Sequence, residues 1–64
     1  MAKSSDQVID ALVADGWTLA RTAGSHCQYK HPIKKGVVTV PHPRKDIKIG
    51  TLKSVEKQAG IKIP

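Results

Sequence analysis

The chain has 64 residues, which is enough for one small domain with a single core and leaves no room for a second one. Eleven basic residues against five acidic residues give a net charge of +6, and the single cysteine excludes an intrachain disulfide framework. No apolar stretch is long enough to span a membrane, and the first residues lack the apolar segment of a signal peptide, so we expect a cytoplasmic protein.

The charge is unevenly distributed along the chain. Residues 1–16 carry one lysine and three aspartates, whereas residues 17–64 carry ten basic residues and two acidic ones. A small domain with such a basic excess is suited to bind a polyanion such as nucleic acid. On composition alone, the alternative is a basic surface that keeps the protein soluble and has no partner.

The first predicted element is a helix over residues 5–15. Ser4 and Gln7 have the spacing of a capping box, and Gly16 suits the left-handed residue that ends a helix. Apolar residues recur inside this segment at helical spacing: Val8, Ile9, Leu12 and Val13. The segment is therefore expected to bury one face.

Three short strands follow, predicted over residues 17–22, 26–31 and 37–40. The first two show an alternating pattern, and the third, Val37-Val38-Thr39-Val40, has the strongest strand propensity in the chain. In the second strand, the alternation places Cys27 and Tyr29 on the side of the core. The other side carries His26, Gln28 and Lys30.

The last predicted element is a helix over residues 50–59 that ends at Gly60, with an apolar stripe formed by Leu52, Val55 and Ala59. The order α-β-β-β-α predicts an α+β two-layer sandwich that forms one domain over residues 1–64. Two helices would cover one face of a three-stranded antiparallel sheet, the layout of double-stranded-RNA-binding domains. The expected core consists of Val8, Ile9, Leu12, Val13, Leu19, Leu52 and Val55, with Trp17 and Tyr29 at least half buried.

His26 is the candidate catalytic residue. It follows Gly24 and Ser25 at a turn, on the sheet face turned away from the helices, and Gly24 permits the close approach of a phosphate. An imidazole beside phosphate-binding cations is the minimum for cleavage of RNA without a metal, because the 2′-OH of RNA is itself the nucleophile. The expected substrate-binding residues are Gly24, Ser25, Lys30, Lys34, Lys35, Arg44 and Lys45. The alternative is an exposed histidine that only hydrogen-bonds its turn.

The sequence predicts neither a metal site nor a cofactor. His26 and His31 are five residues apart on a strand, so their side chains point to opposite faces and cannot hold one ion together. Cys27 lies on the core face and is expected to act as a small apolar residue. His31, before a proline, is expected to be structural, whereas His42, between two prolines, could be structural or functional.

Several motifs in this order resemble the HicA family of toxins, which are small mRNA interferases of type II toxin–antitoxin pairs. The resemblance rests on Gly24-Ser25-His26 followed by Tyr29 and His31-Pro32, on Val38-Thr39-Val40-Pro41, on Gly50-Thr51-Leu52-Lys53-Ser54-Val55 and on Gln58-Ala59-Gly60. It covers residues from about 8 to 61. Asp15-Gly16-Trp17 also fits the junction between the first helix and the first strand of that family.

The resemblance implies a fold like that of double-stranded-RNA-binding domains and a metal-independent endoribonuclease that cleaves mRNA, with His26 as its essential histidine. It also implies a HicB-like antitoxin protein that covers the face bearing His26. Two other functions stay open: a module that uses the same basic face to bind RNA without cutting it, and a protein-interaction partner whose charge serves only an acidic antitoxin.

Overall fold

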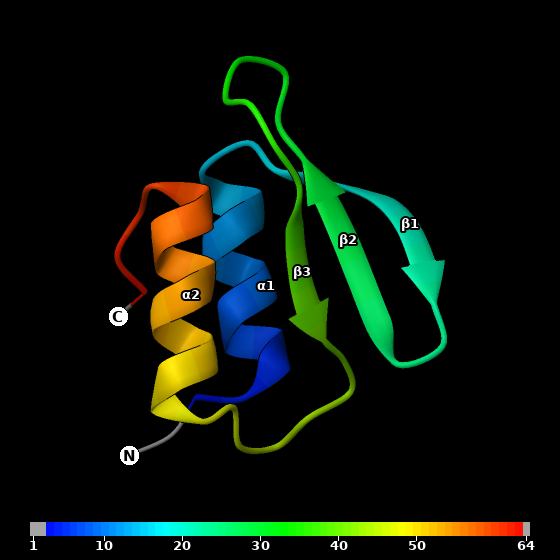
Figure 1. Ribbon diagram of the computed structural model, residues 1–64, viewed down its shortest axis with the longest axis vertical. Helices are drawn as coiled ribbons and strands as arrows, with labels where there is room; N and C mark the ends of the chain where they lie inside the picture. Colours follow the sequence, from blue (N-terminus) through cyan, green and yellow to red (C-terminus); the bar gives the residue numbers. More distant parts are fainter. Residues whose placement is uncertain (1–2, 64) are drawn as a thin grey trace.

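The computed structural model describes residues 3–63 and has the element order α-β-β-β-α (Figure 1). The elements are α1 (Ser5–Ala14), β1 (Thr18–Ala23), β2 (His26–Lys30), β3 (Val38–Pro41) and α2 (Ile49–Ala59). The strands form one antiparallel sheet in the order β1-β2-β3. The predicted fold class is confirmed, and every predicted element begins and ends within one residue of the observed bounds.

The start and end of α1 follow from the residues that flank it. The Ser4 hydroxyl accepts a hydrogen bond from the Gln7 N–H (3.3 Å), and the Gln7 side chain accepts one from the Ser4 N–H (3.0 Å), which completes the predicted capping box. After the helix, Gly16 has a φ of +103°, and a Cβ there would lie 2.9 Å from His31 Nε2. A side chain at position 16 would therefore be strained and would also displace His31.

The core lies between the two helices and one face of the sheet. Leu12 and Trp17 are almost fully buried, and so are Val38 and Val40 of β3. The predicted burial of Val8, Leu52, Val55 and Tyr29 is confirmed as well. Ile9 is partly buried and packs against this cluster.

Two residues expected in the core, Val13 and Leu19, are instead 56% and 55% exposed. Leu19 pairs with Tyr29, so it faces the helix side of the sheet. The helices pack mainly against β3, however, and every residue of β1 is exposed, because this edge strand extends beyond them (Figure 1). The burial predicted for Val13 was wrong for a different reason: Val13 follows Leu12 on α1 and is turned about 100° away from it, out of the buried stripe.

Two buried residues lie outside the predicted elements. Ile47 is almost fully buried, and its N–H donates to the Lys3 carbonyl at 2.7 Å, which joins the loop before α2 to the start of the chain. Ile63 is also buried, and its N–H donates to Glu56 Oε2 at 2.8 Å. The chain is therefore held against α2 as far as Ile63, and Pro64 lies outside the described residues.

Both helices begin at the end of the domain where the loop after β3 runs, and both end at the opposite end (Figure 1). With ten residues in α1 and eleven in α2, neither helix of the described chain is long and apolar enough to cross a membrane.

Candidate functional site

In the described residues, both helices pack against one face of the sheet, and we call the other face the open face (Figure 1). Cys27 and Tyr29 of β2 are buried on the other side, so the alternating residues His26, Gln28 and Lys30 lie on the open face, as predicted. Residues paired across neighbouring strands share a face. The pairing therefore adds residues of β1 and β3 to it: Thr18, Arg21, Ala23, Thr39 and Pro41.

A β-bulge in β1 determines where Arg21 lies. Leu19 pairs with Tyr29, but Arg21, two residues on, pairs with Gln28, so Ala20 is an extra residue in β1. A regular strand would have kept Arg21 in phase with Leu19 on the helix side. The bulge moves the guanidinium to the open face instead, opposite Gln28.

The alternating pattern of residues 17–22 did not predict Arg21 on the open face, because that pattern assumes a regular strand. The signal was present, since Trp17, Leu19 and Arg21 share one phase of the alternation. A charged residue in phase with two large apolar residues on a half-buried strand indicates a change of face, for which a bulge is the usual cause.

The open face is basic, and the described part of the chain places no acidic group on it. Every carboxylate side chain of residues 3–63 lies on a helix, at a helix end or in the loop before α2, and none lies on a strand: Asp6, Asp10, Asp15, Asp46 and Glu56. Arg21 and Lys30 are exposed on this face together with His26. The face is thus suited to a phosphate backbone.

His26 stands at the hairpin turn, next to open space. Gly24 has a φ of +59°, and a Cβ there would meet no atom within 4 Å. His26 pairs with Ala23 across the hairpin and with Pro41 of β3. In the described part of the chain, His31 and His42 form hydrogen bonds through their rings, whereas the His26 ring forms none. The imidazole of His26 is therefore free to meet a ligand.

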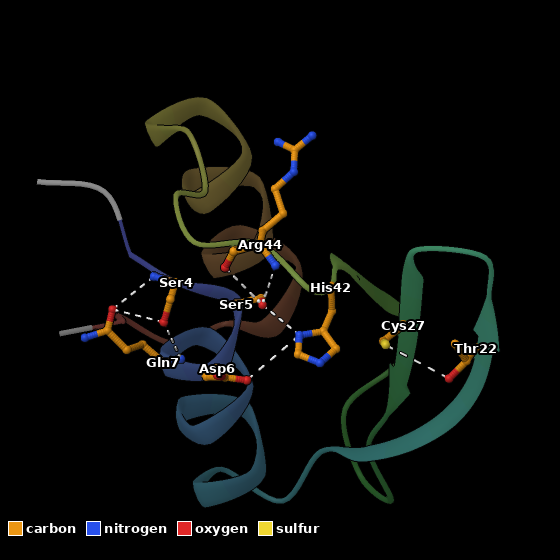
Figure 2. A network of polar contacts seen from close by, with 8 residues as sticks. All are labelled: Ser4, Ser5, Asp6, Gln7, Thr22, Cys27, His42 and Arg44. Atoms are coloured by element: carbon orange, nitrogen blue, oxygen red, sulfur yellow. Dashed lines mark hydrogen bonds and ion pairs between the residues drawn. The ribbon is translucent and has the colours of Figure 1, made fainter.

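His42 anchors the loop after β3 to α1 (Figure 2). Its Nδ1 lies 2.7 Å from the hydroxyl of Ser5, which is buried, and 3.9 Å from Asp6 Oδ1. The same hydroxyl accepts a hydrogen bond from the Arg44 N–H (3.0 Å), and the His42 N–H donates to the Ser25 carbonyl (2.8 Å). His42 therefore has a structural role, on the helix side of the sheet, and its backbone fastens the turn that carries His26.

Two predicted cations lie beside this anchor. The loop after β3 and the start of α1 form an open hollow of about 340 Å³, lined by Ser4, Ser5, Asp6, Pro43, Arg44 and Lys45. The His42 N–H joins the same loop to Ser25, next to His26. Arg44 and Lys45 therefore lie at the same end of the domain as His26.

The other predicted cations lie at the far end of the sheet. Lys30 is four residues from His26 along β2, a span of about 13 Å. Lys34 and Lys35 follow in the loop that leaves that end of β2. Lys34 Nζ lies 2.6 Å from Asp15 Oδ2 and donates to the Ala59 carbonyl at 2.9 Å, so its charge is already compensated.

The Asp15 carboxylate is held ionised by this contact. The hydrogen bond that Lys34 donates lowers the pKa of Asp15 below its ordinary value, although partial burial opposes this shift. The charge of Lys34 and a hydrogen bond from Trp17 Nε1 lower the pKa further. Nearby, His31 Nε2 donates to the Asp15 carbonyl (2.7 Å), while His31 Nδ1 accepts from the N–H groups of Ile33 and Lys34 (3.0 Å each). The structural role expected for His31 is confirmed.

The single cysteine lies on the core side of β2, away from the open face. Cys27 is buried, as predicted, with Thr22 Oγ1 4.0 Å from its sulfur. Burial raises the pKa of the neighbouring Tyr29. No group of three His, Cys, Asp or Glu side chains comes together within residues 3–63.

Comparisons with known proteins agree on one family. The family model described as the HicA toxin of bacterial toxin–antitoxin matches residues 5–61. A solved structure described as the HicA3 and HicB3 toxin–antitoxin complex contains a similar chain, with a TM-score of 0.82 and 35% sequence identity. The match covers 95% of this chain and 98% of that one. Among proteins with curated descriptions, none matches this sequence.

Proposed function

This chain belongs to the HicA toxin family of bacterial toxin–antitoxin pairs, and we propose that it is a metal-independent endoribonuclease that cleaves mRNA with His26 as the catalytic base. The observation that carries the proposal is the place of His26. It is an exposed imidazole without a hydrogen-bond partner in residues 3–63, at an open turn on a basic face without carboxylates. Histidine is the side chain whose ordinary pKa suits proton transfer near neutral pH.

The reaction that this site supports is an internal transesterification of RNA. His26 takes the proton of a 2′-OH, and the 2′ oxygen attacks the adjacent phosphorus. A 2′-O–P bond forms while the bond from phosphorus to the 5′ oxygen breaks, and that oxygen takes a proton from water. His26 then returns its proton to solvent. The protein supplies the base and the cations that stabilise the negative charge on the phosphorane.

Phosphates that flank the cleaved position would be held by the surrounding groups. Arg44 and Lys45 are available at the His26 end, and Gly24 and Ser25 offer a turn that a backbone can approach closely. Lys30 and Lys35 would contact RNA further along the sheet. Lys34 forms an ion pair with Asp15, and we therefore propose that it has a structural role and does not bind phosphate.

The partner that restrains this activity would be a HicB-like antitoxin. The similar solved chain comes from a complex that its description calls HicA3 and HicB3, at 35% identity over nearly the whole chain. By carry-over from that complex, we propose that a HicB-like protein covers the open face and His26. Steric covering is the simplest inhibition for a 64-residue domain, and an acidic partner would be attracted by its charge of +6.

The experiment is RNA cleavage by His26→Ala in the presence of EDTA. Loss of general acid–base catalysis lowers the rate about 10²- to 10⁴-fold, while RNA binding and the thermal midpoint stay close to those of the unmutated protein. Chelator leaves the unmutated protein active. Cleavage by His26→Ala at the original rate contradicts the catalytic role. Tight RNA binding by an unmutated protein that never cuts would establish the binding-module function instead.

A further inference from the structure

We propose that Arg21 is a second catalytic residue, which holds the non-bridging oxygens of the cleaved phosphate beside His26. The inference rests on the proposed ribonuclease function and adds a residue to it. Its starting point is the β-bulge at Ala20, which places Arg21 on the open face opposite Gln28. Bulges of this kind are frequent beside active sites because they redirect one side chain.

The register puts Arg21 next to His26. Arg21 pairs with Gln28, and His26 is two residues from Gln28 on the same strand and the same face. Such diagonal neighbours lie about 7–8 Å apart, with their Cβ atoms somewhat closer, which is within reach of a long side chain. One phosphate between the two side chains can therefore contact both. Lys30 lies about 13 Å from His26 along β2, so it is farther than Arg21 from a phosphate that contacts His26.

The guanidinium is also available for a ligand. Within residues 3–63 the ion pairs are those of Lys34 with Asp15 and of His42 with Asp6, and neither involves Arg21. Among residues 3–63, no strand carries a carboxylate that could compete for the guanidinium. Each residue of β1 is exposed, so the long side chain is not needed to cover the core.

The chemistry of the reaction calls for such a group. When the 2′ oxygen attacks, negative charge accumulates on the non-bridging oxygens of the phosphorane. A guanidinium donates two parallel N–H bonds to two such oxygens and stays charged at every pH of interest. His26 is then left to accept the 2′-OH proton, and the two roles lie on neighbouring strands. Arg21 contacts the reacting phosphate but transfers no proton.

The kinetic test compares Arg21→Gln with two variants that lose the same charge elsewhere. Arg21→Gln is expected to lower kcat about 10²- to 10³-fold with little change in KM, because the contact strengthens in the transition state. Lys30→Gln should mainly raise KM, and Lys57→Gln on α2 should leave both constants unchanged. Arg21→Lys should recover only part of kcat, since an ammonium cannot donate the paired bonds. If Arg21→Gln matches Lys30→Gln in both constants, Arg21 is only a phosphate contact and the proposal is wrong.

A binding measurement separates this proposal from the proposed function. An oligonucleotide with a 2′-deoxyribose at the cleaved position lacks the nucleophile but keeps the phosphate. Titrated into the protein, it should shift the NMR signals of the Arg21 Nε–H and of the His26 ring together. If the unmutated protein cuts no RNA but both signals shift, the ribonuclease function fails and the Arg21 phosphate site stands. If His26 shifts without Arg21, the site is overturned whether or not RNA is cut.

Discussion

Lys34 Nζ and Asp15 Oδ2 lie 2.6 Å apart at the end of the domain opposite His26. Asp15 caps the C-terminal end of α1, and the same ammonium donates to the carbonyl of Ala59, the last residue of α2. One cation therefore meets the negative ends of both helix dipoles, where a positive charge is favourable. This contact is the reason for proposing a structural role for Lys34, which the sequence predicted as a phosphate ligand.

The Asp15–Lys34 pair predicts a loss of stability in acid. A carboxyl whose pKa is lowered in the folded state stabilises the fold above its ordinary pKa of 3.8 and loses that contribution as the pH falls through its lowered value. The thermal midpoint should therefore fall as the pH drops from about 5 toward 2. Asp15→Asn should melt at a lower temperature at pH 7 and show a shallower fall in acid.

The matched control for this prediction is Asp10→Asn, which removes the same charge from an exposed position of α1. It should keep the acid response of the unmutated protein. Equal acid responses for all three proteins would contradict the assigned role of the Asp15–Lys34 pair.

Substitutions at two neighbouring residues of α1, Leu12 and Val13, test which face of this helix packs in the core. Leu12 is completely buried and Val13 is 56% exposed. Leu12→Ala should lower the free energy of unfolding by about 2–5 kcal/mol, a large part of the total for a domain of this size. Val13→Ala should change it by about 0.5 kcal/mol or less. Denaturant unfolding measures both, and similar values for the two variants would mean that α1 is turned differently against the sheet.

The sequence predicted the fold and the face on which His26 lies, because both depend on local patterns. The capping box at Ser4, the alternation around Cys27 and the left-handed Gly60 are each decided within a few residues. It did not predict the exposure of Leu19 or the orientation of Arg21. The exposure of Leu19 depends on how far the helices extend across the sheet, and the orientation of Arg21 depends on one extra residue in β1. The alternation of apolar and polar residues indicates neither.

Substitutions at His31 and at His26 should have opposite effects, the first on the stability of the fold and the second on RNA cleavage. His31 bridges Asp15 to the loop after β2 and packs edge-on against Trp17, with ring centroids 5.2 Å apart. His31→Ala should therefore lower the free energy of unfolding by about 1–3 kcal/mol, because the partly buried groups that the ring bridges lose their hydrogen-bond partner. The fraction that stays folded should cleave RNA normally. His26→Ala should do the reverse, and loss of cleavage by folded His31→Ala would give His31 a part in the chemistry.

The proposed antitoxin contact is tested by hydrogen exchange on the complex. If a HicB-like protein covers the open face, amide protection should increase at the Gly24–Ser25 turn and along β1, an exposed edge strand. The solvent side of α2, around Lys53 and Lys57, should exchange as in the free toxin. Protection confined to the helices would place the antitoxin on the other layer and would require an inhibition that does not cover His26.

RNA binding should depend strongly on salt, because its affinity comes from cations on phosphates. About four such contacts give a slope of log K against log salt near −3 for a single strand, with each contact contributing about −0.7. Arg44→Gln should reduce the slope by about that amount. Lys34→Met should leave it unchanged, because the Lys34 ammonium is paired with Asp15. A smaller slope for Lys34→Met would mean that this lysine leaves Asp15 when RNA binds, and a flat response of the unmutated protein would remove nucleic acid from its function.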